Sequence, residues 1–492
     1  MAIIDTILPR QETKFVKSTD NGGEGYADLV AVVGKAQYSD PNATLINADD
    51  DVYSILGEPS ALYPAPKIIT ELFKTREDTI TGETINGARG VIYVDISVGK
   101  EPGIAILLGL DESDNEYDAI KISFKTAGER QGYSIKVEET GLGYDISIMN
   151  GTEIVDGEVY YNVSPSDLLN EITLTSQYFN AELADDITDP ILIDKLKNGV
   201  VTFTNGSAGV TNSDFKTAVF NALDLIKNDY FDHLCFGVEI SKSDLYNSVF
   251  ITKLKKYFAE RQKNSFHSFI YLPNEVEDKT PAKLRDAVDR IKGIHEMFVR
   301  VINTPLHTED GVRSMFESTA AYCGLVCGTP VKDSTGKMVM SDVTSLGVYL
   351  EPDQQKYLLK NGFTVFERKG LVGGEHRVVS AVTCDLSLNP NGSPGYLREE
   401  HVVREIFFAL NYINMDGFIC STRFEEATQE IKTFITQKKT ELKNMEILDD
   451  FEYEPIRDKK EPRHLIIRYK SFTVNGITKV ITNEVHFNIN LA

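Results

Sequence analysis

The sequence lacks several features that would assign a function directly. Its five cysteines, at positions 235, 323, 327, 384 and 420, include no CxxC pair. Zinc-finger and thioredoxin-like chemistry is therefore not indicated, and we expect free thiols in a chain that folds in a reducing cytoplasm. The longest apolar run, residues 103–110, is far shorter than the roughly 20 residues that cross a bilayer. The first residues lack the basic region of a signal peptide.

Basic residues are also scarce. The chain has 51 Lys and Arg against 74 Asp and Glu, a formal net charge of -23. Nucleic acids and anionic membrane surfaces both attract basic proteins, so neither is an expected partner. A charge of this size keeps free subunits apart until a specific contact overcomes the repulsion.

The sequence contains no recognisable catalytic motif. Neither phosphate-binding glycine motif nor GxSxG occurs, and no two histidines have HxH or HxxxH spacing. Two candidates remain: Ser207, in what we interpret as a strand-to-helix turn, and His307 beside Glu309 and Asp310, where helix capping is the plainer explanation. Cys323 and Cys327 fall on an apolar helical stripe that indicates core packing. We predict no catalytic, cofactor-binding or metal-binding residue, and therefore no enzyme.

The pattern of apolar runs and turn residues changes along the chain. Between residues 89 and 163, short Ile/Val/Tyr-rich runs are broken every 8–12 residues by Gly, Asn and Asp, which is typical of a β-sandwich or barrel. From residue 195, predicted strands (200–204, 234–240, 266–272, 297–303) alternate with predicted helices (213–227, 245–261, 281–291, 311–327), which indicates a parallel α/β sheet. Helices over 399–413 and 422–445 and a hairpin with an Asn-Gly turn at 475–476 follow.

The last ten residues, NEVHFNINLA, alternate between polar and apolar positions. Val485, Phe487, Ile489 and Leu491 would share one face of a β-strand. Chain ends usually fray unless they are held in place. This strand therefore either closes the protein's own sheet or belongs in the sheet of another chain.

Five fragments, in order over about 290 residues, resemble the contractile tail sheath proteins of bacteriophages and related injection machines. They are FTNGSAGVTNSDFKTAVFNAL (203–223), HSFIYLPN (267–274), STAAYCGLVCGTP (318–330), YLLKNGFTVFERKG with EHRVVSAVTC (357–384) and REEHVVREIFFALNYI (398–413). One departure is the single Arg404, where many family members carry adjacent arginines, so no contact is assigned to it. The region at 89–194 matches nothing in the family and would be its variable outward domain.

The resemblance implies a multidomain α/β and α+β fold. It comprises a subtilisin-like α/β core without catalytic residues, an inserted β-sandwich-like outer domain and an α+β C-terminal domain with extended terminal arms. The expected divisions are an N-terminal arm (1–20), an N-terminal sheath region (21–88), the outer domain (89–194), the core domain (195–390), the C-terminal domain (391–483) and a donated C-terminal strand (484–492).

The resemblance also implies a structural subunit that polymerises helically around an inner tube and contracts to drive it through a target cell envelope. Subunits would exchange strands through an N-terminal arm (Ile3, Ile4, Ile7, Leu8) and, beyond a hinge near Asn483, a C-terminal strand (Val485, Phe487, Ile489, Leu491). Lys438, Lys439 and Lys443 are the candidate contact with the tube.

The expected partners are the chain itself, the inner tail tube protein, and the baseplate and tail terminator proteins, without nucleic acid or membrane insertion. The expected location is a virion tail assembled in the host cytoplasm. Three alternatives stay open: a non-viral injection system, a surface-layer or capsid-like protein, and an α/β hydrolase that uses Ser207 or His307.

Overall fold

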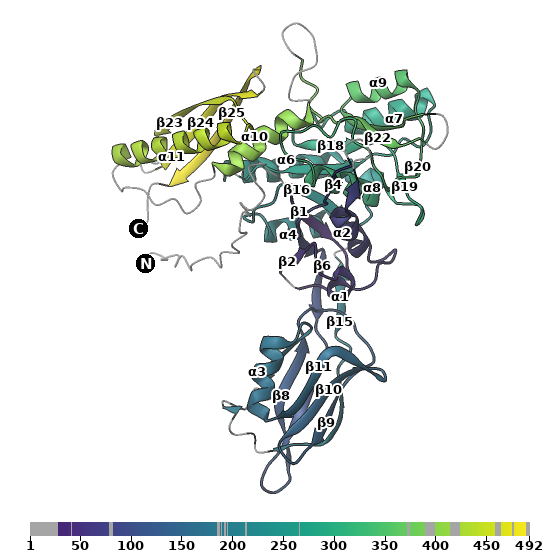
Figure 1. Cartoon of the computed structure of the whole chain (residues 1–492), viewed down its shortest axis with the longest axis vertical. Helices are drawn as coiled ribbons and strands as arrows, with labels where there is room; N and C mark the ends of the chain where they lie inside the picture. Colours follow the sequence, from purple (N-terminus) through teal and green to yellow (C-terminus); the bar gives the residue numbers. More distant parts are fainter. Residues whose placement is uncertain are drawn as a thin grey trace.

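The structure is a computed structural model of the chain. It describes residues 28–488 except 41, 78–81, 185–186, 188, 191–192, 194, 212–213, 265, 371–373, 389–398, 414–423, 458–463 and 475–476. Three bodies are visible in Figure 1. We call them the core (28–96 and 214–413), the outer body (102–206), which a two-stranded ribbon joins to the core, and the C-terminal body (424–488).

The core is built on an eight-stranded sheet. Its order is β2 (Thr44–Asn47), β5 (Gly90–Asp95), β1 (Leu29–Gly34), β16 (His233–Gly237), β17 (Phe269–Pro273), β18 (Val299–Ile302), β21 (Phe363–Arg368) and β22 (His376–Ser380). Neighbours from β5 to β21 are parallel, and the edge strands β2 and β22 are antiparallel. The prediction of a parallel sheet is confirmed for β16, β17 and β18.

Two strands lie in other sheets than the sequence predicts. β5, assigned to the outer domain by a boundary at residue 89, lies between β2 and β1 in the core sheet. The strand at 200–204, assigned to the α/β sheet, is β14 (Gly199–Thr202), and it pairs antiparallel with β9 of the outer body. Short apolar runs look alike in both kinds of sheet, so the run alone did not place either strand.

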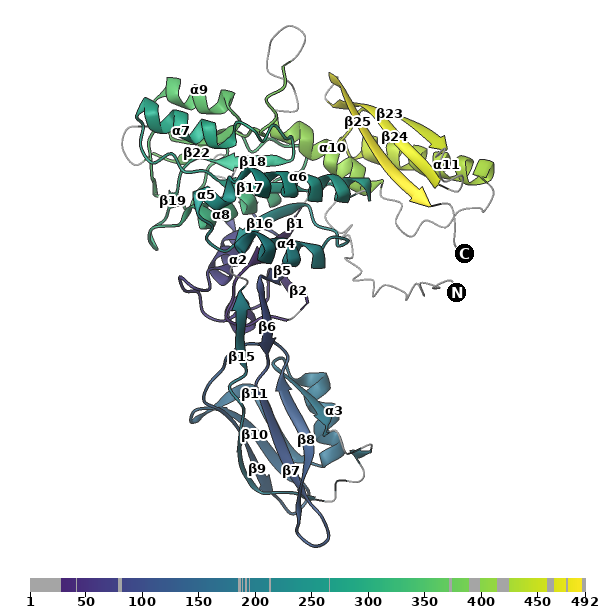
Figure 2. The ribbon, with the colours of Figure 1, turned by 180° about the vertical axis from the view of Figure 1, so that it is seen from behind.

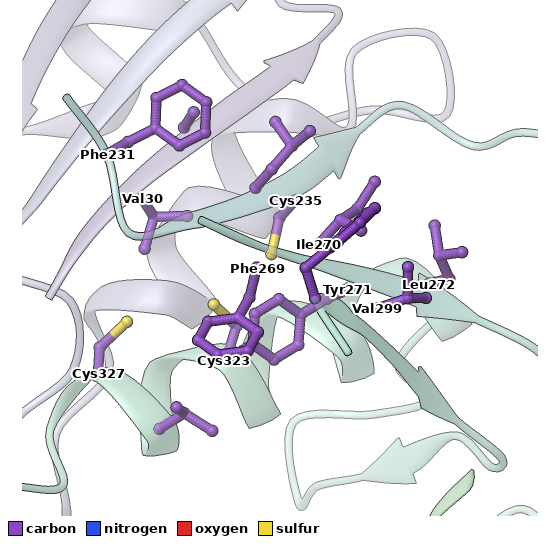
Figure 3. Packing of buried hydrophobic residues seen from close by; sticks show 14 of the residues in the cluster. Val30, Phe231, Cys235, Phe269, Ile270, Tyr271, Leu272, Val299, Cys323 and Cys327 are labelled. Carbon is purple, nitrogen blue, oxygen red and sulfur yellow. The ribbon is translucent and has the colours of Figure 1, made fainter. Parts of the chain in front are cut away.

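Helices cover both faces of the core sheet. Successive residues of a strand point to opposite faces of the sheet. On one face of β16, Cys235 lies beside Cys323 of α8 (Met315–Cys327). On the other face, the ring centroid of Phe236 lies 6.2 Å from that of Phe250 of α6 (Ser248–Lys263). Figure 3 shows the sulfur atoms within this packing. α2 (Ala65–Phe73) packs on α8, and α4 (Phe215–Leu225) packs on α6. The remaining core elements are α1 (Val52–Leu56), α5 (Lys242–Leu245), α7 (Pro281–Ile291), α9 (Pro352–Lys360), α10 (Glu400–Tyr412), β3 (Arg76–Glu77), β4 (Thr84–Ile85), β19 (Leu306–His307) and β20 (Ser345–Leu346).

Glycine allows α2 and α8 to approach closely. A Cβ atom on Gly324 would lie 2.6 Å from the carbonyl oxygen of Leu72, so no side chain fits there. Gly328 follows as the C-cap of α8, and its N–H donates to the carbonyl of Gly324. Glycine at these two positions therefore allows the close contact between α2 and α8 and ends α8.

The outer body consists of two antiparallel four-stranded sheets around one hydrophobic core. One sheet has the order β11 (Glu153–Val163), β10 (Tyr144–Asn150), β9 (Tyr133–Glu139), β14; the other is β12 (Phe179–Leu183), β8 (Glu116–Phe124), β7 (Ile104–Leu110), β13 (Lys195–Leu196). Their inward residues form a cluster of their own, with α3 (Pro165–Thr175) against it. This separate core indicates a body that folds as its own unit.

Candidate assembly interface

The C-terminal body is a three-stranded antiparallel sheet with one long helix along it (Figure 1). The order is β23 (Asp450–Arg457), β24 (His464–Val474), β25 (Ile477–Asn488), and the helix is α11 (Phe424–Asn444). Four rings pack with centroids 5.8–6.5 Å apart: Phe451, Tyr453, Tyr469 and Phe472. α11 adds buried Ile431, Ile435 and Leu442. This core holds the sheet and its helix together.

The terminal strand pairs with its own chain as far as the structure describes it. Val485 and Phe487 lie opposite Ile467 and Leu465 of β24. The predicted donation of residues 484–492 to a neighbour is therefore wrong for 484–488, and the predicted hinge near Asn483 is a register shift inside a continuous strand. β25 pairs antiparallel with β24, and this pairing gives its backbone the partners that a donated strand would need elsewhere.

The odd-numbered positions from 477 to 487 that have a partner lie opposite residues of β24 that are buried, and opposed residues of an antiparallel pair share a face. Ile489 and Leu491 lie outside the described residues. So do Ile3, Ile4, Ile7 and Leu8 of the predicted N-terminal arm.

Among the described strands, β25 leaves one edge without a strand partner, and α6 of the core lies close to part of the strand. Within the described residues it pairs with β24 alone and is the last strand of its sheet. A twelve-residue edge presents a row of unpaired backbone N–H and C=O groups, which is a template for a strand from another chain.

Two of the three lysines predicted to contact a tube are engaged within the subunit. Lys438 Nζ lies 2.8 Å from Glu441 Oε2 and 4.4 Å from the ring centroid of Tyr412. The hydrogen bond from Lys438, with one from Tyr412, lowers the pKa of Glu441 to about 2. Lys439 pairs with Asp450 and donates to the carbonyl of Phe451 at 3.0 Å.

The third lysine, Lys443, is exposed, as is Lys432, and neither lies in an ion pair among the described residues. They are eleven residues apart, three helical turns, so they lie on one side of α11. These two lysines are the basic groups that α11 presents to solvent.

α10 (Glu400–Tyr412), the last described core helix before α11, is fixed to the core at both ends by buried polar contacts. At its first residue, Glu400 forms an ion pair with Arg300 of β18, and neither side chain is exposed. At its other end, the side-chain amide of Asn411 donates to the carbonyl of His267 and accepts from its N–H, each at 2.8 Å.

The middle of α10 is held by Arg404. Its Nη2 donates to the carbonyls of Val326 and Thr329, at 3.0 and 2.5 Å, and its Nη1 to that of Asp333 at 3.2 Å. These carbonyls lie at and after the end of α8, where a helix leaves carbonyls without partners in the helix. None of these contacts of Arg404 is predicted from the sequence. The one feature of the sequence that could have indicated a buried role for Arg404 is its position within an apolar helical stripe.

The two catalytic candidates lie in different parts of the chain, one in the ribbon and one in the core. Ser207 is in β15 (Ser207–Thr211), a strand of the ribbon rather than the expected strand-to-helix turn, and its Oγ accepts from the N–H of Gly209 at 3.2 Å. His307 is in β19, and it does not cap α8, whose N-cap is Ser314. His307 lines a cleft of about 540 Å³ at the carboxyl ends of β16 and β17, without Ser207.

The described part of the chain offers no cluster of His, Cys, Asp and Glu that would hold a metal ion. Over the same residues, no helix is both long and apolar enough to cross a membrane. Cys235, Cys323, Cys327 and Cys384 are buried free thiols, in agreement with the sequence prediction, and Cys420 lies outside the described residues.

The fold is similar to that of solved sheath tail proteins. A sheath tail protein from Listeria innocua superposes with a TM-score of 0.64 at 15% identity, over 95% of this chain and 96% of that chain. Another, from Desulfitobacterium hafniense, gives 0.55 at 14% identity, over 94% and 97%. No family model and no curated protein sequence matches. The likeness is therefore one of fold, and it extends over nearly the whole of all three chains.

Proposed function

We propose that the chain is the structural subunit of a contractile tail sheath. The observation that carries the proposal is the fold likeness to two sheath tail proteins over nearly the full length of each. The five family-like fragments of the sequence support it independently of the fold. In this proposal the subunit acts by assembly and repacking, its α/β core is subtilisin-like without catalytic residues, and no cofactor takes part.

Subunits join through the open edge of β25. In our proposal the N-terminal arm of a neighbouring subunit adds Ile3, Ile4, Ile7 and Leu8 to this edge as a fourth strand, with backbone hydrogen bonds supplying affinity. Such head-to-tail contacts do not close, so they generate a helical tube.

The assembled sheath surrounds an inner tube, meets a baseplate at one end and a terminator at the other, and stands on a virion tail assembled in the host cytoplasm. Contraction repacks the folded bodies while the strand links keep neighbours joined. The free-energy difference between the two packings drives the tube through the target envelope. The outer body and ribbon (97–211) contain 20 acidic and seven basic residues, more than half of the net charge of -23, so their mutual repulsion biases the choice of packing. A non-viral injection system with the same mechanics is the second candidate, because the fold and the edge strand would serve it equally.

Proline tests the edge strand without removing it. In a β-strand the N–H groups of successive residues point alternately to the two sides. In each of the pairs Thr478/Lys479 and Glu484/Val485, therefore, one N–H faces β24 and the other faces the open edge. Proline at the open-edge position should leave the hairpin intact and stop polymerisation. Proline at the other position should destabilise the hairpin.

The two prolines of each pair serve as controls for one another. Electron microscopy counts polymers, and circular dichroism follows thermal unfolding of the subunit. If all four variants fold and polymerise as the unmodified chain does, β25 is not the edge to which a strand is added.

The tube contact is tested with the two exposed lysines of α11. We propose that Lys443, with Lys432, binds an acidic face of the tube, because Lys438 and Lys439 already have partners within the subunit. Lys432→Glu/Lys443→Glu should weaken sheath–tube co-assembly roughly tenfold or more at low salt. Lys256→Glu/Lys263→Glu, which reverses two exposed lysines of α6, is the matched control. Equal co-assembly of the two variants would remove this face of α11 from the tube contact.

A further inference from the structure

The outer body is joined to the core by an unusual ribbon (Figure 2). β6 (Ser97–Glu101) and β15 (Ser207–Thr211) pair antiparallel, and among the described strands neither pairs with a strand of either body. Val98 and Val210 face one another across the ribbon and are 60% and 71% exposed. The ribbon is therefore solvated on that face and is not held there by packing on either body.

The ribbon carries a pair of glycines at one level. Gly99 and Gly209 lie opposite each other, between the partners Val98–Val210 and Lys100–Ala208, with φ of +70° and +67°. Both strands thus have a left-handed backbone conformation at the same level of the ribbon. Glycine adopts this conformation readily, whereas it is strained for other residues. Two glycines in register form the point at which such a ribbon bends most easily.

Three contacts reach across this point to one core segment, residues 36–39, which follows β1. Lys100 Nζ donates to the carbonyl of Ala36 at 2.7 Å and also forms a buried ion pair with Asp95, at the end of β5, at 2.8 Å. Ser39 and Ala127 exchange both backbone hydrogen bonds, at 2.9 and 2.8 Å. The guanidinium carbon of Arg130 lies 3.6 Å from the ring centroid of Tyr38, which belongs to the core, and 4.3 Å from that of Phe124, which belongs to the outer body.

Arg130 acts as a clamp between one ring of each body. It is 7% exposed, and its remaining hydrogen bonds go to Thr126 in its own body. A guanidinium on an aromatic face is attracted to the ring more strongly when both are buried, because water does not compete for the charge. A cavity of about 330 Å³, lined by Tyr38, Tyr63, Arg130 and Tyr133 among others, lies beside the clamp. On that side, therefore, the two bodies are not in continuous contact.

We propose that residues 36–39 form a docking cradle that fixes the orientation of the outer body, and that the Gly99–Gly209 step is the hinge about which the body turns when the cradle releases it. While docked, the outer body moves as one piece with the core. Once released, it stays folded on its own hydrophobic core and reorients about the ribbon. The proposal rests on contacts within one chain and does not depend on the assembly proposed above.

Distances between two spin labels test the cradle directly. One label replaces Leu142, an exposed residue in the turn between β9 and β10, and the other replaces Lys256 on α6, in a subunit that carries Cys420→Ser. The unaltered cradle should give a narrow distance distribution. Tyr38→Ser/Lys100→Met should broaden it at least twofold, because the clamp and the lysine contact are both lost. Lys121→Met/Tyr161→Ser changes the same residue types on the outer body and should leave the width unchanged.

A disulfide separates loss of docking from loss of folding. Ser39 and Ala127 form a hydrogen-bonded antiparallel pair, whose Cα atoms lie about 5.5 Å apart, within disulfide range. Adding Ser39→Cys/Ala127→Cys to the broadened variant and oxidising it should restore the narrow distribution. A broad distribution in the unaltered subunit, an equal width after Tyr38→Ser/Lys100→Met, or no narrowing on oxidation would each overturn the proposal.

Discussion

Replacing Glu400 with alanine should lower the free energy of unfolding by about 3–5 kcal/mol, because it leaves the charge of Arg300 buried without its partner. Neither side chain of this ion pair is exposed to solvent. Glu400 Oε2 also accepts from Thr335 Oγ1 at 2.5 Å and from the hydroxyl of Tyr322 at 3.3 Å. The alanine therefore also deprives two hydroxyl groups of their buried acceptor.

The other partner cannot relieve the loss by giving up its charge. Burial lowers the pKa of Arg300, and the nearby charge of Arg404 acts in the same direction, yet a guanidinium stays protonated in proteins. Stacking on Phe269, whose ring centroid is 3.9 Å from the guanidinium carbon, replaces only part of the lost interaction.

Calorimetry of the subunit measures this effect against two comparisons. Glu399→Ala, at the neighbouring half-exposed position, should change stability by less than about 1 kcal/mol. Arg300→Met/Glu400→Leu removes both charges and should be less destabilising than Glu400→Ala. A loss below about 1 kcal/mol for Glu400→Ala would mean that this ion pair does not hold α10 on the core.

The core strands at 234–240, 266–272 and 297–303 could be predicted from sequence because each is a short apolar run followed by a helix with a clear stripe. β5 has the same texture as the outer strands, and only its burial along the whole length of Gly90–Asp95 distinguishes it. That uninterrupted pattern is typical of a strand covered on both faces. In the sequence this strand contains the continuous apolar run VIYV, which lacks the alternation of polar and apolar residues seen at 485–491.

The assembly site was only partly predictable, for a different reason. The alternation at 485–491 predicts a strand with one apolar face, and Val485 and Phe487 lie opposite buried residues of β24. Alternation reports which face is buried and not which chain supplies the neighbouring strand. The engagement of Lys438 with Glu441, and of Arg404 with three carbonyls, depends on the meeting of separate elements, which local patterns do not encode.

A second residue of α10 should make stability depend on pH. Glu405 is 2% exposed. Burial raises the pKa of its carboxyl group from 4.5 to about 8, Asp449 and Asp333 act in the same direction, and Arg404 opposes them. The folded chain therefore keeps this proton at a pH where the unfolded chain has released it.

The sign of the effect follows from that difference. The contribution of protonated Glu405 to stability is fully present below about pH 4.5 and falls by about 1.4 kcal/mol per pH unit as the pH rises toward 8. Glu405→Gln cannot ionise, so it should be more stable than the unmodified chain by about 3–5 kcal/mol at pH 8.5 and nearly equal to it at pH 4.5. Calorimetry at both pH values measures the change, and Glu430→Gln on the exposed side of α11 is the matched control. Parallel pH profiles for Glu405→Gln and the unmodified chain would contradict the assignment.

The position of Glu405 determines which part of the structure its ionisation destabilises. Asp333 follows α8 in the core, and Asp449 directly precedes β23 of the C-terminal body, so the carboxyl group of Glu405 lies among acidic groups from both. Ionisation places three negative charges at the joint between the core and the body that carries the open edge. Glu400, Arg404 and Asn411 still hold the helix on the core, so the repulsion falls on the contact with the C-terminal body. Raising the pH should therefore loosen that body before the core unfolds, and hydrogen exchange in β23 should increase at a lower pH than in β17.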